Sequence, residues 1–142
     1  MKAITIKQPF ATLLALGYKR YETRSWQTKH RGKLAIHAGK SIDRQACERP
    51  EVKQILQGAG YESWRDLPTG AVIGIGELTN CSRVLAQDVP KAVATIDSGQ
   101  IDGLAYKFGD FTVGRYAWEV ANVELLTEPI LCRGRLSLWE WS

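Results

Sequence analysis

Three charged side chains lie close together in the stretch GYKRYETRSW, Gly17–Trp26. Arg24 has a planar fork of donors that suits a phosphate or the edge of a base. Lys19 is a flexible point charge for phosphate or, if desolvated, a base with a lowered pKa. Glu22 would hold either cation in place, or accept a proton or an amino N–H of cytosine or guanine. One interpretation of this pattern is a pocket that binds a polar, anionic ligand.

A second interpretation of the same residues is a solvated strand with an ion-pair network, in which each exposed pair contributes only about 0–1 kcal/mol. On a strand, Glu22, Arg24 and Trp26 share one face. Trp26 then offers a surface for base stacking, which contributes roughly 1–3 kcal/mol. The residues alone leave both interpretations open.

Positive charge is concentrated near the N-terminus. Residues 1–40 contain nine Lys and Arg and one acidic residue, which gives a net charge of +8. Residues 41–142 contain ten Lys and Arg and fourteen acidic residues, which gives −4. This asymmetry favours an anionic partner, although a basic face without a ligand would look the same. Further residues predicted to line or extend the site are Lys7, Gln8, Arg31, Lys33 and Lys40.

Other candidate residues are weaker. His37 ends a short strand near the basic segment, where either a site residue or an ordinary hydrogen-bonded histidine fits. Glu77 is a second acid that the fold would bring close, or a solvated strand residue. HAGKS lacks the first glycine of a phosphate-binding loop, and the cysteines and histidines have no metal-ligand spacing. We therefore expect neither a cofactor nor a metal.

The elements that must position these residues follow from periodicity. KAITI predicts a first strand, and FATLLALG predicts a helix that starts after Pro9 and stops at Gly17. Further strands are expected at 18–26, 32–38, 71–84 and 111–126, the last either a strand pair or one bent strand. Residues 41–60 predict a helix in two pieces with Asp43 or Ser41 as cap, and a short helix is expected around VPKAVATI.

Five or six strands, some bent at glycines, and two or three helices predict a small curved sheet or barrel of mixed α and β content. The 142 residues suit a single domain, 1–142. No apolar run suits a membrane helix or a signal peptide, so we expect a cytoplasmic protein without membrane partners.

The sequence resembles the activating-signal-cointegrator homology (ASCH) domain family. Its motif G-x-K-x-x-E-x-R is matched without a gap by Gly17, Lys19, Glu22 and Arg24. The start TIKQPFATLLALG, the segments RGKLAIHAGK and VIGIGEL, and the ending YAWEVANVELL…EPI…CRGRLSLW are also similar to that family and occur in the same order.

The resemblance implies an α+β fold: a small curved β-barrel related to the pseudouridine-synthase/archaeosine-transglycosylase (PUA) domain, with flanking helices. It also implies a cleft beside the first helix that binds single-stranded RNA, DNA or a modified nucleotide, with RNA as the main expectation. The alternative is a metal-independent hydrolase, either an N4-acylcytidine amidohydrolase or a ribonuclease, with Lys19 and Glu22 as catalytic residues. The amidohydrolase branch has a Thr where this chain has Glu22, which weakens that alternative.

Overall fold

A computed structural model describes residues 1–142 and consists mostly of strands with a few short helices. The strands are β1 (Lys2–Gln8), β2 (Tyr21–Arg24), β3 (Gly32–Ile42), β4 (Ala71–Asp88), β5 (Val93–Ile96), β6 (Gly99–Ile101), β7 (Tyr116–Leu131) and β8 (Leu138–Glu140). The helices are α1 (Phe10–Ala15), α2 (Arg44–Cys47), α3 (Pro50–Gly58) and α4 (Gly103–Lys107), with the 3₁₀ turn η1 (Trp64–Asp66). None of the helices has the length and apolarity needed to cross a membrane.

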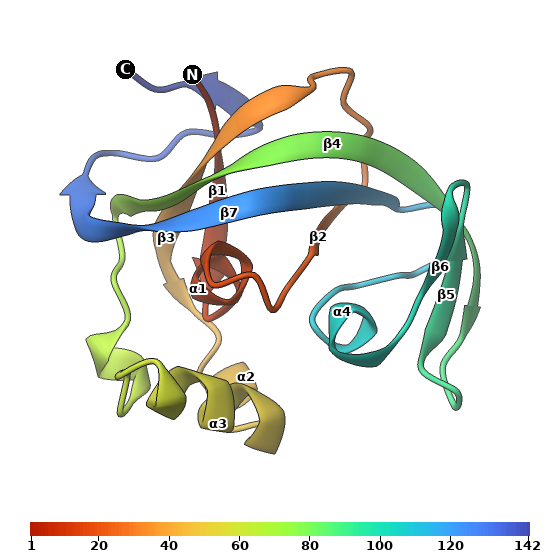
Figure 1. Cartoon of the computed structure of the whole chain (residues 1–142), viewed down its shortest axis with the longest axis horizontal. Helices are drawn as coiled ribbons and strands as arrows, with labels where there is room; N and C mark the ends of the chain where they lie inside the picture. The colour runs from red at the N-terminus through yellow and green to blue at the C-terminus, as the bar shows by residue number, and fades with distance from the viewer.

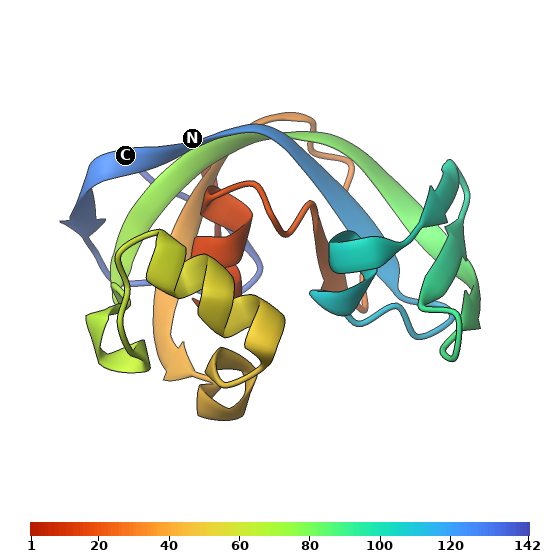
Figure 2. The ribbon, with the colours of Figure 1, turned by 60° about the horizontal axis from the view of Figure 1, so that its bottom comes forward.

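One sheet organises the chain in the order β2-β7-β4-β3-β1-β8, and the β5–β6 hairpin pairs with the end of β4. The β1–β3 pair is parallel and the others are antiparallel. The long strands β4 and β7 arch over α1, with α2 and α3 below one end of the arch and α4 below the other (Figures 1 and 2). The mixed α+β class is as predicted.

The sheet does not close into the expected barrel. Strands β2 and β8 stand at opposite ends of the strand order and do not pair with each other. They have four and three residues, and each already pairs with one long neighbour, β7 or β1. Such short end strands offer too little backbone to join the two edges, so the sheet stays open.

Glycines in β4 shape the arch, as the sequence predicted. The register between β4 and β7 shifts at three places, each next to or within the Gly74–Asn80 stretch. A Cβ at Gly76 would lie 2.8 Å from Val120 Cγ1, and a Cβ at Gly74 would lie 3.0 Å from Ala15 Cβ. These two positions therefore let β7 and α1 approach the β4 backbone closely.

Helix α1 is fixed at its start by Gln8, which was predicted as a site residue, and ends at Gly17 as predicted. At its start, the buried side chain of Gln8 accepts a 3.0 Å hydrogen bond from Thr12 N and donates a 2.7 Å bond to Pro68 O. At its end, Gly17 has a φ of +90°, which favours glycine. Leu14 and Ala15 pack in the main core with strand residues of β1, β3, β4 and β7.

Two further expectations have different outcomes. The helix in two pieces is confirmed as α2 and α3, and Asp43 caps α2 by accepting a 3.0 Å bond from Ala46 N. The helix around VPKAVATI is wrong, because Val93–Ile96 is strand β5. The β-branched residues of VATI favour a pleated strand, and alternate residues are buried against the β4 end of the sheet.

Candidate functional site

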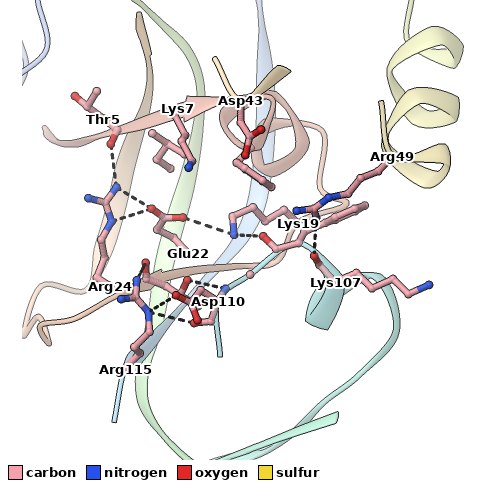
Figure 3. A pocket seen from close by; sticks show the side chains of 15 residues that line it. Thr5, Lys7, Lys19, Glu22, Arg24, Asp43, Arg49, Lys107, Asp110 and Arg115 are labelled. Atoms are coloured by element: carbon pink, nitrogen blue, oxygen red, sulfur yellow. Dashed lines mark hydrogen bonds and ion pairs between the residues drawn. The ribbon is translucent and has the colours of Figure 1, made fainter. Parts of the chain in front are cut away.

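A pocket of about 550 Å³ opens where β1, β2 and the start of α1 face the segment around α4. Three of the four motif residues, Lys19, Glu22 and Arg24, line it together (Figure 3). The other lining residues are Thr5, Ile6, Lys7, Phe10, Thr23, Asp43, Arg49, Lys107, Phe108, Gly109, Asp110 and Arg115.

Glu22 holds both motif cations. Arg24 Nε donates a 2.8 Å bond to Glu22 Oε2, and Arg24 Nη2 lies 2.7 Å from the same oxygen as an ion pair. Lys19 Nζ lies 3.6 Å from the other oxygen, Oε1. Arg24 Nη2 also donates a 2.9 Å bond to the carbonyl of Thr5, while its Nη1 makes no hydrogen bond within the protein. The structure therefore brings these three charges together in one hollow.

The turn after α1 places Lys19 and Glu22. The amides of Tyr18 and Lys19 both donate 3.0 Å bonds to Leu13 O, and the left-handed Gly17 turns the chain out of the helix. Strand β2 then pairs with β7, where Glu22 lies opposite the buried Trp118. Two residues of β2 on the same face, Glu22 and Arg24, consequently point into the pocket.

Lys19 is buried, with 3% of its surface exposed. Its Nζ donates a 2.6 Å bond to Phe108 O and lies 5.7 Å from the centre of the Phe10 ring, within cation–π range. Desolvation by this burial lowers the pKa of Lys19 below its ordinary value of 10.5, although the neighbouring Glu22 carboxylate acts in the opposite direction. Burial therefore makes the neutral amine of Lys19 easier to form than that of a surface lysine.

A second set of contacts, around Arg115 and Asp110, lies below Glu22 and Arg24 in Figure 3. Arg115 donates from Nη2 to Thr23 O at 3.1 Å, and its Nε lies 3.5 Å from Asp110 Oδ2. The Thr23 hydroxyl accepts a 3.1 Å bond from Asp110 N. A hydrogen bond from the Thr112 hydroxyl is the main reason that the pKa of Asp110 is lowered.

The pocket has a surplus of positive charge. Six of its residues are cationic and three are acidic, which gives +3. Lys7 and Arg49 are exposed at the rim and form no ion pair. The ammonium of Lys107 extends away from Glu22 in Figure 3, and without it the balance is still +2. Such a hollow attracts anions.

Of the other predicted site residues, only Lys7 lines this pocket. Gln8 is fully buried at the start of α1. Trp26 lies outside the pocket lining, and its ring packs edge-on against Trp118 with centroids 4.7 Å apart. Arg31 is exposed and donates to the carbonyls of Thr28 and His30 in its own turn.

Three predicted residues belong to other surfaces. Glu77 is exposed on β4 opposite Lys33 of β3 and does not line the pocket. His37 and Lys40 line a second pocket of about 770 Å³. His37 is buried, with Nε2 at 2.8 Å from Cys132 O and Nδ1 at 3.2 Å from the Thr5 hydroxyl.

Several pocket residues were absent from the sequence-based set. Arg49, Lys107 and Arg115 come from the part of the chain whose charges sum to −4, so composition gave no sign of them. Thr5 contributes a backbone carbonyl, which no side-chain pattern reveals. Nowhere do three or more His, Cys, Asp or Glu side chains gather as a metal site would require.

Comparison with known proteins places the chain in a family. Activating signal cointegrator 1 of Homo sapiens is 38% identical over 80 residues, and the protein of that name in Mus musculus is 40% identical over 80 residues. Each match covers 55% of this chain and 14% of the relative, so the chain matches only a small part of these proteins. The ASCH domain model matches residues 4–129, and the chain therefore belongs to the ASCH domain family.

Proposed function

We propose that the pocket around Lys19, Glu22 and Arg24 binds single-stranded nucleic acid, with RNA as its main ligand. The observation that carries this proposal is the +3 surplus of charge in one hollow of nucleotide-compatible size. Membership of the ASCH family supports it, because the resemblance implies binding of RNA or nucleotides.

Each part of the pocket has a role in this proposal. Glu22 and the Thr5 carbonyl hold the Arg24 guanidinium in one orientation and leave Nη1 for a phosphate or base edge. Lys7 and Arg49 at the rim supply unpaired charge for neighbouring phosphates. The half-buried ring of Phe10 is the aromatic surface of the pocket against which a base would stack.

The test is the fluorescence anisotropy of labelled single-stranded RNA titrated with the protein at several salt concentrations. We expect affinity to fall with salt, and the double variant Lys7→Ala/Arg49→Ala to lower the slope of log K against log salt by about 1.4, roughly 0.7 for each phosphate contact. The matched control is Lys91→Ala/Arg83→Ala, which removes two exposed charges outside the pocket. Absence of salt-dependent binding, or equal slopes in both double variants, would contradict the proposal.

A second candidate function is a metal-independent hydrolase that acts on N4-acylcytidine or on RNA. The observation that favours it is the buried Lys19 with a lowered pKa next to Glu22 Oε1, the carboxylate oxygen that Arg24 leaves unoccupied. Glu22 would take a proton from water as the water oxygen attacks the acyl carbon, and Lys19 would stabilise the oxyanion. Collapse of the resulting tetrahedral intermediate then breaks the bond between the acyl carbon and N4, and the proton that Glu22 took from water passes to N4 of cytidine.

Incubation of the protein with N4-acetylcytidine and with labelled RNA, followed by chromatography, tests this candidate. We expect cytidine and acetate, or RNA fragments, and a loss of at least about 100-fold in rate for Glu22→Gln and for Lys19→Met. Glu48→Gln is the control, because Glu48 forms an exposed pair with Lys53 outside the pocket. Unchanged rates in both pocket variants would exclude these two residues as catalytic groups.

A further inference from the structure

The second pocket adjoins the first and has the same surplus of charge. Thr5 lines both pockets. The second pocket contains three cationic residues, Lys40, Arg133 and Arg135, and no carboxylate, so its balance is +3 with His37 neutral. None of these three side chains forms an ion pair within the protein.

The segment that follows β7 carries two of these cations and is fixed to the sheet by its backbone. Cys132 N donates a 3.1 Å bond to Gly70 O, and Cys132 O lies 2.8 Å from His37 Nε2. Because a carbonyl only accepts, Nε2 of His37 carries the proton in this contact. The carbonyl of Arg135 lies 3.4 Å from the Thr5 hydroxyl. Arg133 and Arg135 thus project from an anchored backbone while their side chains stay exposed.

Gly134 permits this close attachment. A Cβ at position 134 would lie 2.7 Å from His37 Cε1 and 2.8 Å from the Thr5 hydroxyl oxygen, closer than real Cβ atoms approach. Lys40 extends from the end of β3 over Gly70, where a Cβ would lie 3.6 Å from Lys40 Cε. Three cations from two segments therefore surround one hollow without neutralising partners.

Thr5 connects the two pockets with different atoms. Its carbonyl accepts the 2.9 Å bond from Arg24 in the first pocket. Its hydroxyl lies 3.2 Å from Nδ1 of His37, which lines the second pocket, and accepts a 3.2 Å bond from the buried Trp139 indole N–H. One residue of β1 is thus the wall between two positive hollows. Two neighbouring hollows of equal charge suit a chain of phosphates better than a single nucleotide, which would fill only one of them.

We propose that the pocket of Lys40, Arg133 and Arg135 is a second phosphate-binding site, and that one nucleic-acid strand crosses Thr5 to occupy both pockets. This inference rests on the proposed function of the first pocket and extends it to the ligand class: an oligonucleotide strand and not a mononucleotide. The second pocket would contact phosphates only, because its polar side chains are cations and buried hydrogen-bonded groups.

The experiment compares a short and a long ligand on the full chain. The short probe is cytidine monophosphate, and the long probe is a labelled single-stranded RNA of about 12 nucleotides, within the roughly 4–16 that nucleic-acid modules cover. The variants are Arg133→Ala/Arg135→Ala for the second pocket, Lys7→Ala/Arg49→Ala for the first, and Lys91→Ala/Arg83→Ala as control. All of these side chains are exposed, so their removal leaves the core intact.

We expect Arg133→Ala/Arg135→Ala to weaken binding of the long RNA and to lower its salt slope by about 1.4, with unchanged affinity for cytidine monophosphate. Lys40→Ala should act in the same direction with about half that slope change. Lys7→Ala/Arg49→Ala should weaken the binding of both ligands.

If the long RNA binds the second-pocket variants with the same affinity and salt slope as it binds the control variant, the inference fails and the first site stands. If the second-pocket variants weaken the binding of cytidine monophosphate as much as the binding of the long RNA, the proposal of one strand that occupies two separate sites is wrong. If the wild type binds neither probe, the proposed function itself fails.

Discussion

Glu22 and Arg24 meet through one carboxylate oxygen, which accepts a 2.8 Å bond from Nε and lies 2.7 Å from Nη2 of the guanidinium. The second oxygen of Glu22 is thereby left facing the buried ammonium of Lys19. The three motif charges form one connected group that lines the pocket, and not separate surface pairs (Figure 3). The surface ion-pair interpretation of the motif therefore does not apply to this fold.

Glu22→Gln is expected to destabilise the protein. The substitution leaves Lys19 and Arg24 without their shared counter-charge, and loss of one partner of a buried pair costs about 3 kcal/mol. The matched control is Glu48→Gln, which breaks an exposed pair with Lys53 and should cost less than about 1 kcal/mol. Urea denaturation of both variants measures the difference, and equal midpoints would show that the Glu22 contacts contribute no more than a surface pair.

Lys19 should make the stability of the protein depend on pH in the alkaline range. Burial lowers the pKa of Lys19 below 10.5 in the folded state. At pH values between this lowered pKa and the unfolded value of 10.5, the unfolded chain therefore binds more protons than the folded chain. The free energy of unfolding of the wild type should consequently rise with pH through the window that ends near 10.5. Lys19→Met lacks this effect.

The measurement is urea denaturation of the wild type and of Lys19→Met from neutral pH to about 10.5. The stability of the wild type relative to the variant should increase with pH. Other titrating groups, including Tyr21, whose pKa burial raises, cancel in this difference. A constant or decreasing difference would contradict a desolvated Lys19.

Gly76→Ala tests the close approach of β7 to β4. The added methyl would meet Val120 Cγ1 at 2.8 Å and Val123 Cγ1 at 2.9 Å, and overpacking of this kind costs about 1–3 kcal/mol. Gly58→Ala is the control, because the last residue of α3 has open space around it and alanine favours helices by about 0.5 kcal/mol. The midpoint temperature of thermal unfolding should therefore fall for Gly76→Ala and rise for Gly58→Ala. A stabilised Gly76→Ala protein would show that the arch does not depend on this glycine.

Local patterns predicted much of the fold. The first helix between Pro9 and Gly17, the two-piece helix and the glycine-bent β4 depend on neighbours in sequence, and all are confirmed. The patterns left open a curved sheet or a barrel, and the sheet is curved and not closed, so the barrel that the resemblance implied is not confirmed. The helix around VPKAVATI is wrong, because pairing with the end of β4 makes Val93–Ile96 a strand. The expectation for 111–126 left open a strand pair or one bent strand, and β7 is one strand.

The site was predictable mainly where its residues belong to one motif, with Lys7 at the end of β1 as the one predicted residue outside the motif that also lines the pocket. Lys19, Glu22 and Arg24 lie within β2 and the turn before it, so strand alternation and the helix end bring them together. Arg49 and Arg115 belong to distant segments of the chain, and the packing of α3, α4 and β7 brings them to the pocket. No single stretch of sequence reveals this packing. Trp26 is drawn away from the expected face because its ring packs against Trp118 beyond the end of β2.

The position of the bound ligand tests the central proposal most directly. Two-dimensional ¹H–¹⁵N NMR spectra report the side-chain Nε–H of Arg24 and Arg115 and the amide of Gly109, all within the pocket. On addition of single-stranded RNA, we predict that these resonances shift while Arg83 Nε–H and the amide of Ala92, outside both pockets, stay in place. Shifts confined to Arg83 and the Ala92 turn, with the pocket resonances unmoved, would contradict the proposed site.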